Sequence, residues 1–117
     1  MITCVLEYRI DWTKQAEFEA WCRMWLELIP EFGGVHHGYF LPSEGHSDVA
    51  LGLFSFRSLS EYEDYRIKAK SHPGALSADQ YKAGTGCVRS WDRRFFTPLF
   101  PSENMPAWSE DIKEVSS

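Results

Sequence analysis

Two adjacent histidines, His36 and His37, are the side chains of this sequence best suited to move a proton near neutral pH. Both lie in an apolar segment that also contains Tyr39. Neighbouring residues of a strand point to opposite faces of a sheet, so we do not expect the two imidazoles to act as one pair. One histidine beside Tyr39 could activate a hydroxyl group of a ligand, or it could be a structural histidine in a polar layer of the core. The candidate catalytic residues are therefore His36, His37 and Tyr39.

Charged residues at alternating positions form a second group of candidates. Glu7 and Arg9 lie near the N-terminus, and Arg89 and Arg93 flank Trp91. If these two segments are neighbouring strands, the first pair could approach the second across the ladder. An enclosed arginine could hold a carboxylate, enolate or phosphate of a ligand, whereas the alternative is a salt bridge between strands or subunits. Trp91 could form a ligand wall or simple packing. The candidate ligand-binding residues are Glu7, Arg9, Arg89 and Trp91.

Several other chemistries lack support in the sequence. The four histidines do not have the spacing of a metal site, and we expect no metal. The segments 33–34 and 84–86, which contain the paired glycines, are typical of turns rather than of a phosphate-binding loop, and we expect no bound cofactor. Acidic residues outnumber basic ones by 17 to 12, for a net charge of −5, which argues against a nucleic-acid partner.

The N-terminal segment and the cysteines indicate the cellular compartment in which we expect the protein. Residues 1–7 contain no basic segment, long apolar run or small-residue cleavage site, so we expect no secretory or transit signal. No stretch approaches about 18 apolar residues, so we expect no contact with a membrane. The 3 cysteines are odd in number and widely spaced, which does not indicate a disulfide framework. We therefore expect a cytoplasmic protein.

Apolar periodicity predicts the elements in the order strand, helix, strand, strand, helix, strand. The strands are expected over residues 2–10, 35–42, 48–56 and 86–97, with a hairpin loop over 43–47. One helix is expected from a cap at Thr13 to the glycines at 33–34, kinking or ending near Pro30, and another over 59–71. A shorter helical turn is expected over 75–82. The first strand has five apolar residues on one face, Ile2, Cys4, Leu6, Tyr8 and Ile10.

Both predicted helices carry a stripe of apolar residues at helical spacing. In the long helix the stripe is aromatic and consists of Phe18, Trp21, Trp25 and Phe32. Such a stripe is typical of core packing, although it could also line a pocket between helix and sheet. In the second helix the stripe consists of Leu59, Tyr62, Tyr65, Arg66 and Ala69. The remaining charged residues of that helix, including Lys70, are expected to face water.

This order of elements is that of a ferredoxin-like fold of the α+β class, a four-stranded antiparallel sheet with two helices on one face. The strand over 48–56 is apolar on both sides, so one of two rows is left uncovered. These rows are Ala50, Gly52, Phe54 and Phe56, or Val49, Leu51 and Leu53. An uncovered patch of that size marks an interface, and the simplest partner is a second copy of the chain. We therefore expect a homodimer.

Several segments of the chain resemble bacterial NIPSNAP-family proteins. These are residues 7–10 with 18–19, residues 32–40, residues 53–56 with Tyr62, and residues 94–96. The run from Gly33 to Tyr39 is the most specific of them. The resemblance covers about residues 1–100, which we take as one domain, and leaves 101–117 as a C-terminal tail. It implies a dimeric α/β barrel in which two ferredoxin-like sheets close on each other, related to the antibiotic-biosynthesis-type monooxygenases, but it implies no settled reaction.

Three functions follow from these residues and from the resemblance. The first is a homodimeric barrel that binds a small aromatic or carboxylate-bearing molecule, because polar groups lie on strands that are otherwise apolar. The second is a cofactor-independent monooxygenase of the antibiotic-biosynthesis type, by analogy of fold. The third is a non-catalytic protein-interaction module that uses the acidic tail over 101–117. Whether the protein is an enzyme stays open at this point.

Overall fold

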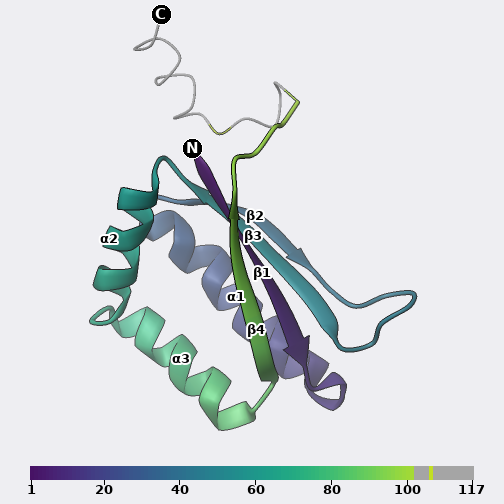
Figure 1. Cartoon of the computed structure of the whole chain (residues 1–117). Helices are drawn as coiled ribbons and strands as arrows, with labels where there is room; N and C mark the ends of the chain where they lie inside the picture. The colour runs from purple at the N-terminus through teal and green to yellow at the C-terminus, as the bar shows by residue number, and fades with distance from the viewer. Residues whose placement is uncertain (102–105, 107–117) are drawn as a thin grey trace, which may run out of the picture.

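Four antiparallel strands form one sheet in the order β2-β3-β1-β4, with the helices gathered on one of its faces (Figure 1). The computed structural model describes residues 1–101 and 106. The strands are β1 (Ile2–Ile10), β2 (Val35–Phe40), β3 (Val49–Phe56) and β4 (Val88–Phe96). The helices of the described part are α1 (Gln15–Glu31), α2 (Leu59–Ala69) and α3 (Pro73–Thr85). This topology confirms the predicted α+β, ferredoxin-like fold.

The predicted alternation of β1 is confirmed. Cys4, Leu6, Tyr8 and Ile10 are buried on the face that the helices cover. In the antiparallel register of β1 and β3, Cys4 pairs with Phe54 and Tyr8 pairs with Ala50. Directly paired residues share a face. The helix-covered row of β3 is therefore Ala50, Gly52, Phe54 and Phe56.

The start of α1 differs from the sequence prediction, which placed the cap at Thr13. The Asp11 carboxylate instead accepts a hydrogen bond from the Thr13 backbone N–H at 3.0 Å and caps a short 3-10 turn over Trp12–Lys14, after which α1 begins. Asp competes well with Thr as a cap, and its position two residues earlier is the reason for the shift. The end of α1 is as predicted: Pro30 lies in its last turn, and Gly33 follows with a φ of 89°.

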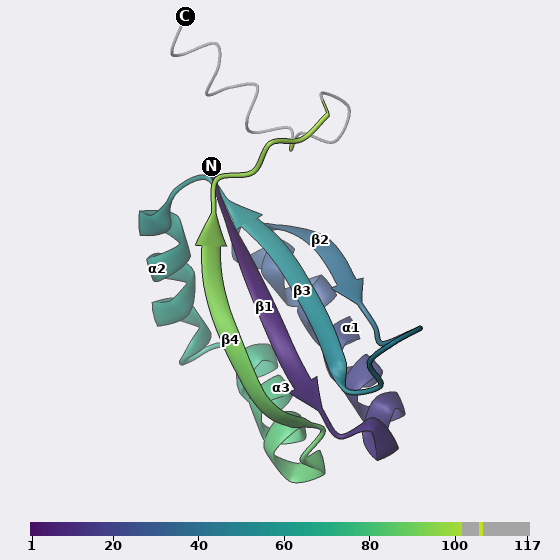
Figure 2. The ribbon, with the colours of Figure 1, turned by 45° about the vertical axis from the view of Figure 1, so that its right-hand side comes forward.

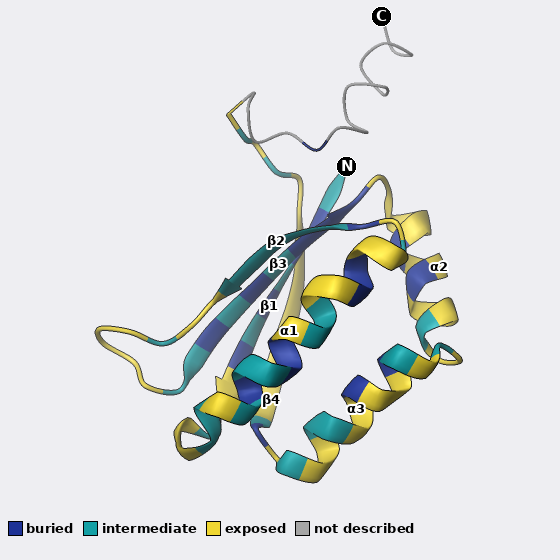
Figure 3. Ribbon diagram, turned by 180° about the vertical axis from the view of Figure 1, so that it is seen from behind, coloured by how far each residue is buried: buried dark blue, intermediate teal, exposed yellow. Residues whose placement is uncertain are grey.

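The segment predicted as a short helical turn over 75–82 is a full helix of 13 residues, α3, so three helices rather than two occupy the covered side. The His72 side chain caps α3 by accepting from the backbone N–H groups of Gly74 and Ala75 at 3.1 and 3.2 Å, and Pro73 follows at the first turn. The buried residues of α3 are Ala75 and Ala78. Small buried residues give a weak apolar stripe, which explains why the sequence pattern underestimated this helix. Figure 3 shows α1 and α3 side by side with exposed residues on their outer surfaces.

A β-bulge in β2 sets which of its side chains face the helices. His36 pairs with Phe54 of β3, but Gly38 rather than His37 pairs with the next residue, Leu53. His37 is therefore the extra residue, and Gly38 has a φ of 108°, which favours glycine. Because of this extra residue, His36 and Tyr39 lie on the same, helix-covered face although they are three positions apart.

The other face of the sheet carries no helix in the described part of the chain, and Figure 2 shows it in front. The row of β3 on this face is Val49, Leu51 and Leu53, all only partly covered. Phe40 and Phe96 lie at its two edges and are 56% and 50% exposed. We call this surface the open face. Among the described residues, no helix combines the length and the apolar character needed to cross a bilayer.

Candidate functional site

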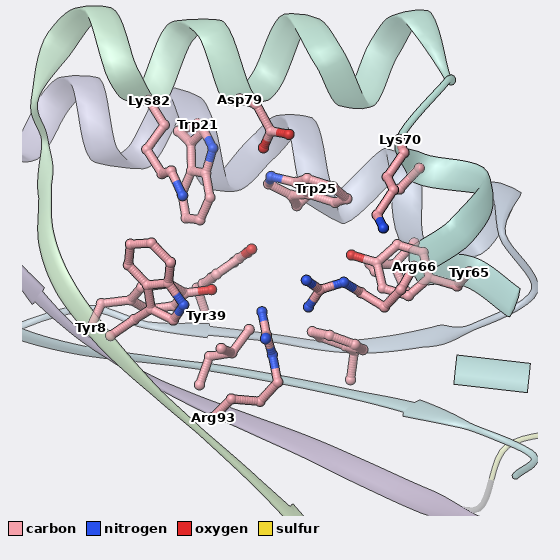
Figure 4. Close-up of a pocket in the computed structure, with 15 residues that line it drawn as sticks. Tyr8, Trp21, Trp25, Tyr39, Tyr65, Arg66, Lys70, Asp79, Lys82 and Arg93 are labelled. Atoms are coloured by element: carbon pink, nitrogen blue, oxygen red, sulfur yellow. The ribbon is translucent and has the colours of Figure 1, made fainter. Parts of the chain in front are cut away.

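A cavity of about 310 Å³ lies between the helix-covered face of the sheet and the three helices (Figure 4). The sheet contributes Leu6, Tyr8, Tyr39, Phe54, Trp91 and Arg93; α1 contributes Trp21, Trp25 and Ile29; and α2, α3 and their link contribute Tyr65, Arg66, Ala69, Lys70, Asp79 and Lys82. Trp91, Arg66 and Arg93 are exposed, whereas Tyr8 and Trp21 are buried. The exposed residues form the mouth of the cavity, and the buried ones form its floor and inner wall.

Aromatic rings form most of the inner surface of this cavity. Tyr8 packs edge-on against Trp21 with ring centroids 5.5 Å apart, and Tyr39 lies 6.2 Å from Tyr8 and 6.4 Å from Trp21. At another part of the wall, Tyr65 of α2 packs edge-on against Trp25 of α1 at 6.2 Å. Interlocked rings have few alternative rotamers, so the cavity has fixed walls that suit a flat apolar ligand.

The charge of the cavity is opposite in sign to that of the protein. Four basic residues line it, Arg66, Lys70, Lys82 and Arg93, against one acidic residue, Asp79. Among the described residues, the ion pairs within 4 Å involve other basic groups, and none involves these four. The whole chain has a net charge of −5. The cavity is therefore a locally positive site on an acidic protein, which favours an anionic ligand.

The four basic groups differ in how far they are already engaged. The Lys82 ammonium lies 4.1 Å from the centroid of the Trp91 ring and 5.7 Å from that of Trp21, so it bridges two aromatic walls. Arg66 donates one hydrogen bond to the Tyr62 hydroxyl at 3.1 Å and retains its other N–H groups. Figure 4 shows the guanidinium groups of Arg66 and Arg93 pointing into the cavity. These two arginines are the donors best placed for a ligand.

The ionisable groups on the floor are held in their neutral forms. Burial raises the pKa of Tyr8 and of Tyr39 above their usual range, so both phenols keep their protons near neutral pH. Cys4 lies in the core beside the cavity rather than in its lining; burial raises the pKa of its thiol to about 11, and the Arg93 guanidinium partly opposes that rise. The floor therefore offers neutral hydroxyl donors beside fixed positive charges.

The two predicted histidines lie on opposite sides of the sheet. His36 is behind the cavity wall, with its ring 4.7 Å from that of Tyr39, and its Nδ1 accepts from the Gly38 backbone N–H at 2.9 Å. Burial lowers the pKa of His36 to about 4, so the ring is neutral at pH 7. Its Nε2 atom is buried and has no hydrogen-bond partner among the described residues. His36 supports Tyr39 but does not line the cavity.

His37 is on the open face and belongs to a short polar chain. Its Nε2 lies 2.7 Å from the Ser55 hydroxyl, which in turn lies 2.7 Å from the Thr3 hydroxyl. Ser55 and Thr3 are buried, and the Phe100 ring packs 5.0 Å from the imidazole. Burial lowers the pKa of His37. The hydrogen bonds pair the polar side-chain atoms of Thr3, His37 and Ser55 with one another. His37 therefore lies on the opposite side of the sheet from the cavity and does not line it.

The predicted contacts of Glu7 and Arg9 with Arg89 or Arg93 are wrong. Glu7 pairs with Arg94 at 3.6 Å, Arg9 with Asp48 at 3.7 Å, and Arg89 with Asp11 at 3.8 Å. The register explains the first case, since Arg94 pairs with Val5 and shares the open face with Glu7, whereas Arg93 points to the helices. A β-bulge between Arg9 and Ile10 shifts the register of the pairing between β1 and β4 at the end of the ladder near Val88. Of the predicted site residues, Tyr39 and Trp91 line the cavity, and so does Arg93, which the sequence grouped with them.

The sequence prediction missed Lys70, which directly follows α2, and Asp79 and Lys82 of α3, which all line the cavity. One signal existed for Arg66: it is a charged residue on the apolar stripe of α2. The sequence left open whether the aromatic stripe of α1 packs in the core or lines a pocket. Trp21 and Trp25 line the cavity, so the second alternative is confirmed for these two residues. Phe18 is part of the closed core. The proposed role of the tail over 101–117 lies almost wholly outside the described residues.

Neither the cysteines nor the other possible ligands form a metal site in the part of the chain that the structure describes. No group of three or more His, Cys, Asp or Glu residues is suitably arranged there. Cys4, Cys22 and Cys87 are all buried and free. Buried thiols of this kind are packing residues.

Comparison with known proteins gives a family and a fold. A family model described as NIPSNAP matches residues 5–103. A NIPSNAP family protein of Agrobacterium tumefaciens has a similar structure, with a TM-score of 0.74 and 19% identity over 89% of this chain and 98% of that one. An uncharacterised NIPSNAP domain protein of Burkholderia xenovorans gives 0.73 and 16% over 87% and 100%. A search of curated proteins finds no match.

A structure from a second group of proteins has the same fold. It is described as a putative antibiotic biosynthesis monooxygenase from Nitrosomonas europaea, with a TM-score of 0.64 and 13% identity over 86% of this chain and 100% of that one. At such low identity the likeness concerns the fold alone. The predicted ferredoxin-like architecture is confirmed by it.

Proposed function

This chain belongs to the NIPSNAP family, and on that premise we propose that it is a homodimer whose subunits each bind a small aromatic or carboxylate-bearing molecule in the cavity between sheet and helices. The observation that carries the proposal is the set of basic side chains around aromatic walls. Arg66 and Arg93 reach the cavity without a carboxylate partner among the described residues. Like charges that converge on one cavity repel each other, and an anion between them relieves that repulsion.

The chemistry of the two ends of the cavity defines the ligand. Arginine presents a planar fork of N–H donors that matches the two oxygens of a carboxylate. The rings of Trp21, Trp25 and Tyr39 supply flat apolar contact for the body of the ligand. A molecule that combines an aromatic ring with an anionic group uses both halves of the site.

Calorimetric titration with 2-naphthoate, and with the neutral 2-naphthamide as its matched isostere, tests this proposal. Hydrogen bonds to charged groups contribute about 1.5–3 kcal/mol, so the carboxylate should bind roughly 10- to 100-fold more tightly than the amide. Arg66→Gln should remove most of this difference. Arg23→Gln, on the outer face of α1 where its side chain is 72% exposed, should not. Equal binding of acid and amide, or binding of neither, contradicts the proposal.

The open face of the sheet supports the homodimer. Val5, Leu51 and Leu53 are only partly covered, and Phe40 and Phe96 flank them with more than a third of their surface exposed. A contiguous apolar patch of this kind marks an interface, and a two-fold partner would bury the same residues on both copies. Light scattering at micromolar concentration should report twice the 13.5 kDa chain mass. Leu53→Arg should shift the species to the single-chain mass, and a wild-type monomer would remove this part of the proposal.

A second candidate function is cofactor-independent oxygenation of an electron-rich aromatic compound. It is favoured by the fold shared with the monooxygenase-like protein and by an aromatic cavity that carries phenol donors. Oxygen consumption with an anthrol- or quinol-type compound tests it. Uptake above the rate without protein, lost in Arg93→Gln, supports this function. No uptake with any such compound excludes it and leaves the binding proposal intact.

A further inference from the structure

We propose that the cavity takes acidic phenols and enols as its ligands and binds them as their oxyanions, thereby making the hydroxyl group of the bound molecule more acidic than it is in water. This inference rests on the proposed function and narrows its ligand class. It follows from which hydrogen-bond donors and which charges line the cavity.

The hydroxyl donors come from two strands of the sheet. Tyr8 of β1 and Tyr39 of β2 both line the cavity, and the side chains of the two tyrosines interact with each other. Each phenol has one proton to donate. If one hydroxyl donates to the other, the second still has its proton for an oxygen atom of the ligand. An oxyanion accepts that hydrogen bond more strongly than a neutral hydroxyl does.

The charges around the same region come from the remaining elements. Arg93 of β4 and Arg66 of α2 both line the cavity, and Figure 4 shows their guanidinium groups pointing into it. Lys70 follows α2, and α3 supplies Lys82 and the single carboxylate, Asp79. Helix α1 contributes no charged residue to the lining. Figure 4 shows Asp79 on the side of α3, across the cavity from Arg93.

These groups together favour one protonation state of the ligand. A positive charge within about 4–6 Å stabilises the charged form of an acid and lowers its pKa by about 1–3 units. The neutral tyrosine donors act in the same direction because they hydrogen-bond the anion. Binding therefore breaks the O–H bond of the ligand, the proton passes to solvent, and the oxyanion stays between the donors. No oxidant and no further reactant is needed for this step.

A site that binds phenols as oxyanions differs from one that only binds carboxylates, because it changes the protonation state of its ligand. A carboxylic acid is already ionised near neutral pH, so its binding says nothing about proton loss. A weakly acidic phenol changes its protonation state on binding, and the change can be followed directly. The probe is therefore 4-nitrophenol, because its anion absorbs visible light and its neutral form does not.

Spectrophotometric pH titration of 4-nitrophenol with saturating protein tests the inference. The pKa of the bound probe should fall by about 1 unit or more relative to the free probe. Arg93→Gln and, separately, Tyr39→Phe should each return at least half of that shift. The matched control is Arg94→Gln, whose side chain lies on the open face and pairs with Glu7, and it should keep the full shift.

The outcomes separate this inference from the proposed function. Binding of the probe with an unchanged or raised pKa overturns the inference, while the proposed function stands if 2-naphthoate still binds. A shift that survives in both Arg93→Gln and Tyr39→Phe also overturns it, because the cause then lies elsewhere. Failure of both 4-nitrophenol and 2-naphthoate to bind overturns the inference together with the proposed function.

Discussion

Replacing Gly52 with alanine should destabilise the protein, because Gly52 lies beneath the Tyr39 ring at the floor of the cavity. The two residues are directly paired across β2 and β3. A methyl group on Gly52 would lie 2.7 Å from Cε1 and 3.0 Å from Cδ1 of Tyr39, and 3.4 Å from Cε2 of Tyr8. The first two distances are shorter than van der Waals contact, so the Tyr39 ring must move.

The surroundings of Tyr39 leave it little room to move. Its ring packs 4.7 Å from the ring of His36 and 6.4 Å from those of Phe18 and Trp21. Adding a carbon atom to a well-packed core costs typically about 1–3 kcal/mol, and we expect a loss of about 2 kcal/mol here. For a domain of this size that corresponds to a fall in Tm of roughly 10 °C. Because the displaced ring also forms the cavity floor, Gly52→Ala should weaken the binding of 2-naphthoate as well.

Urea and thermal unfolding followed by circular dichroism measure this effect, with Gly84→Ala as the matched control. Gly84 lies in α3, and a methyl group there meets no atom within 4 Å. The same substitution should therefore stabilise the protein by about 0.5–1 kcal/mol through helix propensity and loss of unfolded-state entropy. Equal stability of Gly52→Ala and wild type would refute the reasoning, since Tyr39 would then be free to move.

Three further predictions concern stability. The pKa of His36 is lowered to about 4 in the folded state, so the contribution of the neutral ring to stability is fully present above pH 6.5 and is lost as the pH falls towards 4. The free energy of unfolding should fall by at most about 3 kcal/mol between pH 7 and pH 4.5. The fall should be smaller in His36→Phe, when unfolding of the two proteins is compared at these two pH values. Gly38→Ala should cost about 1–2 kcal/mol in urea unfolding, because φ is 108° at the bulge; a neutral result would mean that the bulge relaxes. Ser58→Ala should cost about 1 kcal/mol, because the Ser58 hydroxyl caps α2 by accepting from the Glu61 N–H at 3.1 Å, and an unchanged urea midpoint would contradict this role.

Alternation of apolar residues was sufficient to predict the sheet. The face of β1 that carries Cys4, Leu6 and Tyr8 follows from a strict period of two, and the strand order follows from the sequence of elements. The same rule fails in β2, where alternation alone would place His36 and Tyr39 on opposite faces. The bulge that brings them together has one local sign in the sequence, Gly38, and its position depends on the pairing with β3.

The cavity was harder to predict because three of its charged residues lie in α3 or at the end of α2, at positions that resemble ordinary solvated surface. The sequence pattern placed none of Lys70, Asp79 and Lys82 on an apolar stripe. Their roles depend on how α2 and α3 pack beside β4, and α3 packs through two small alanines that give little periodic signal. Tyr39 was found because it lies near the paired histidines in the sequence, and Trp91 because it lies between Arg89 and Arg93.

A crystal structure of the protein with 2-naphthoate tests the central claim most directly, because it locates the ligand as well as detecting it. The naphthalene ring should lie against Trp25 and Tyr39, between the sheet and the helices, with its carboxylate within hydrogen-bond distance of Arg66 and Arg93. A ligand found instead on the open face of the sheet, or an empty cavity at saturating ligand, would contradict the account.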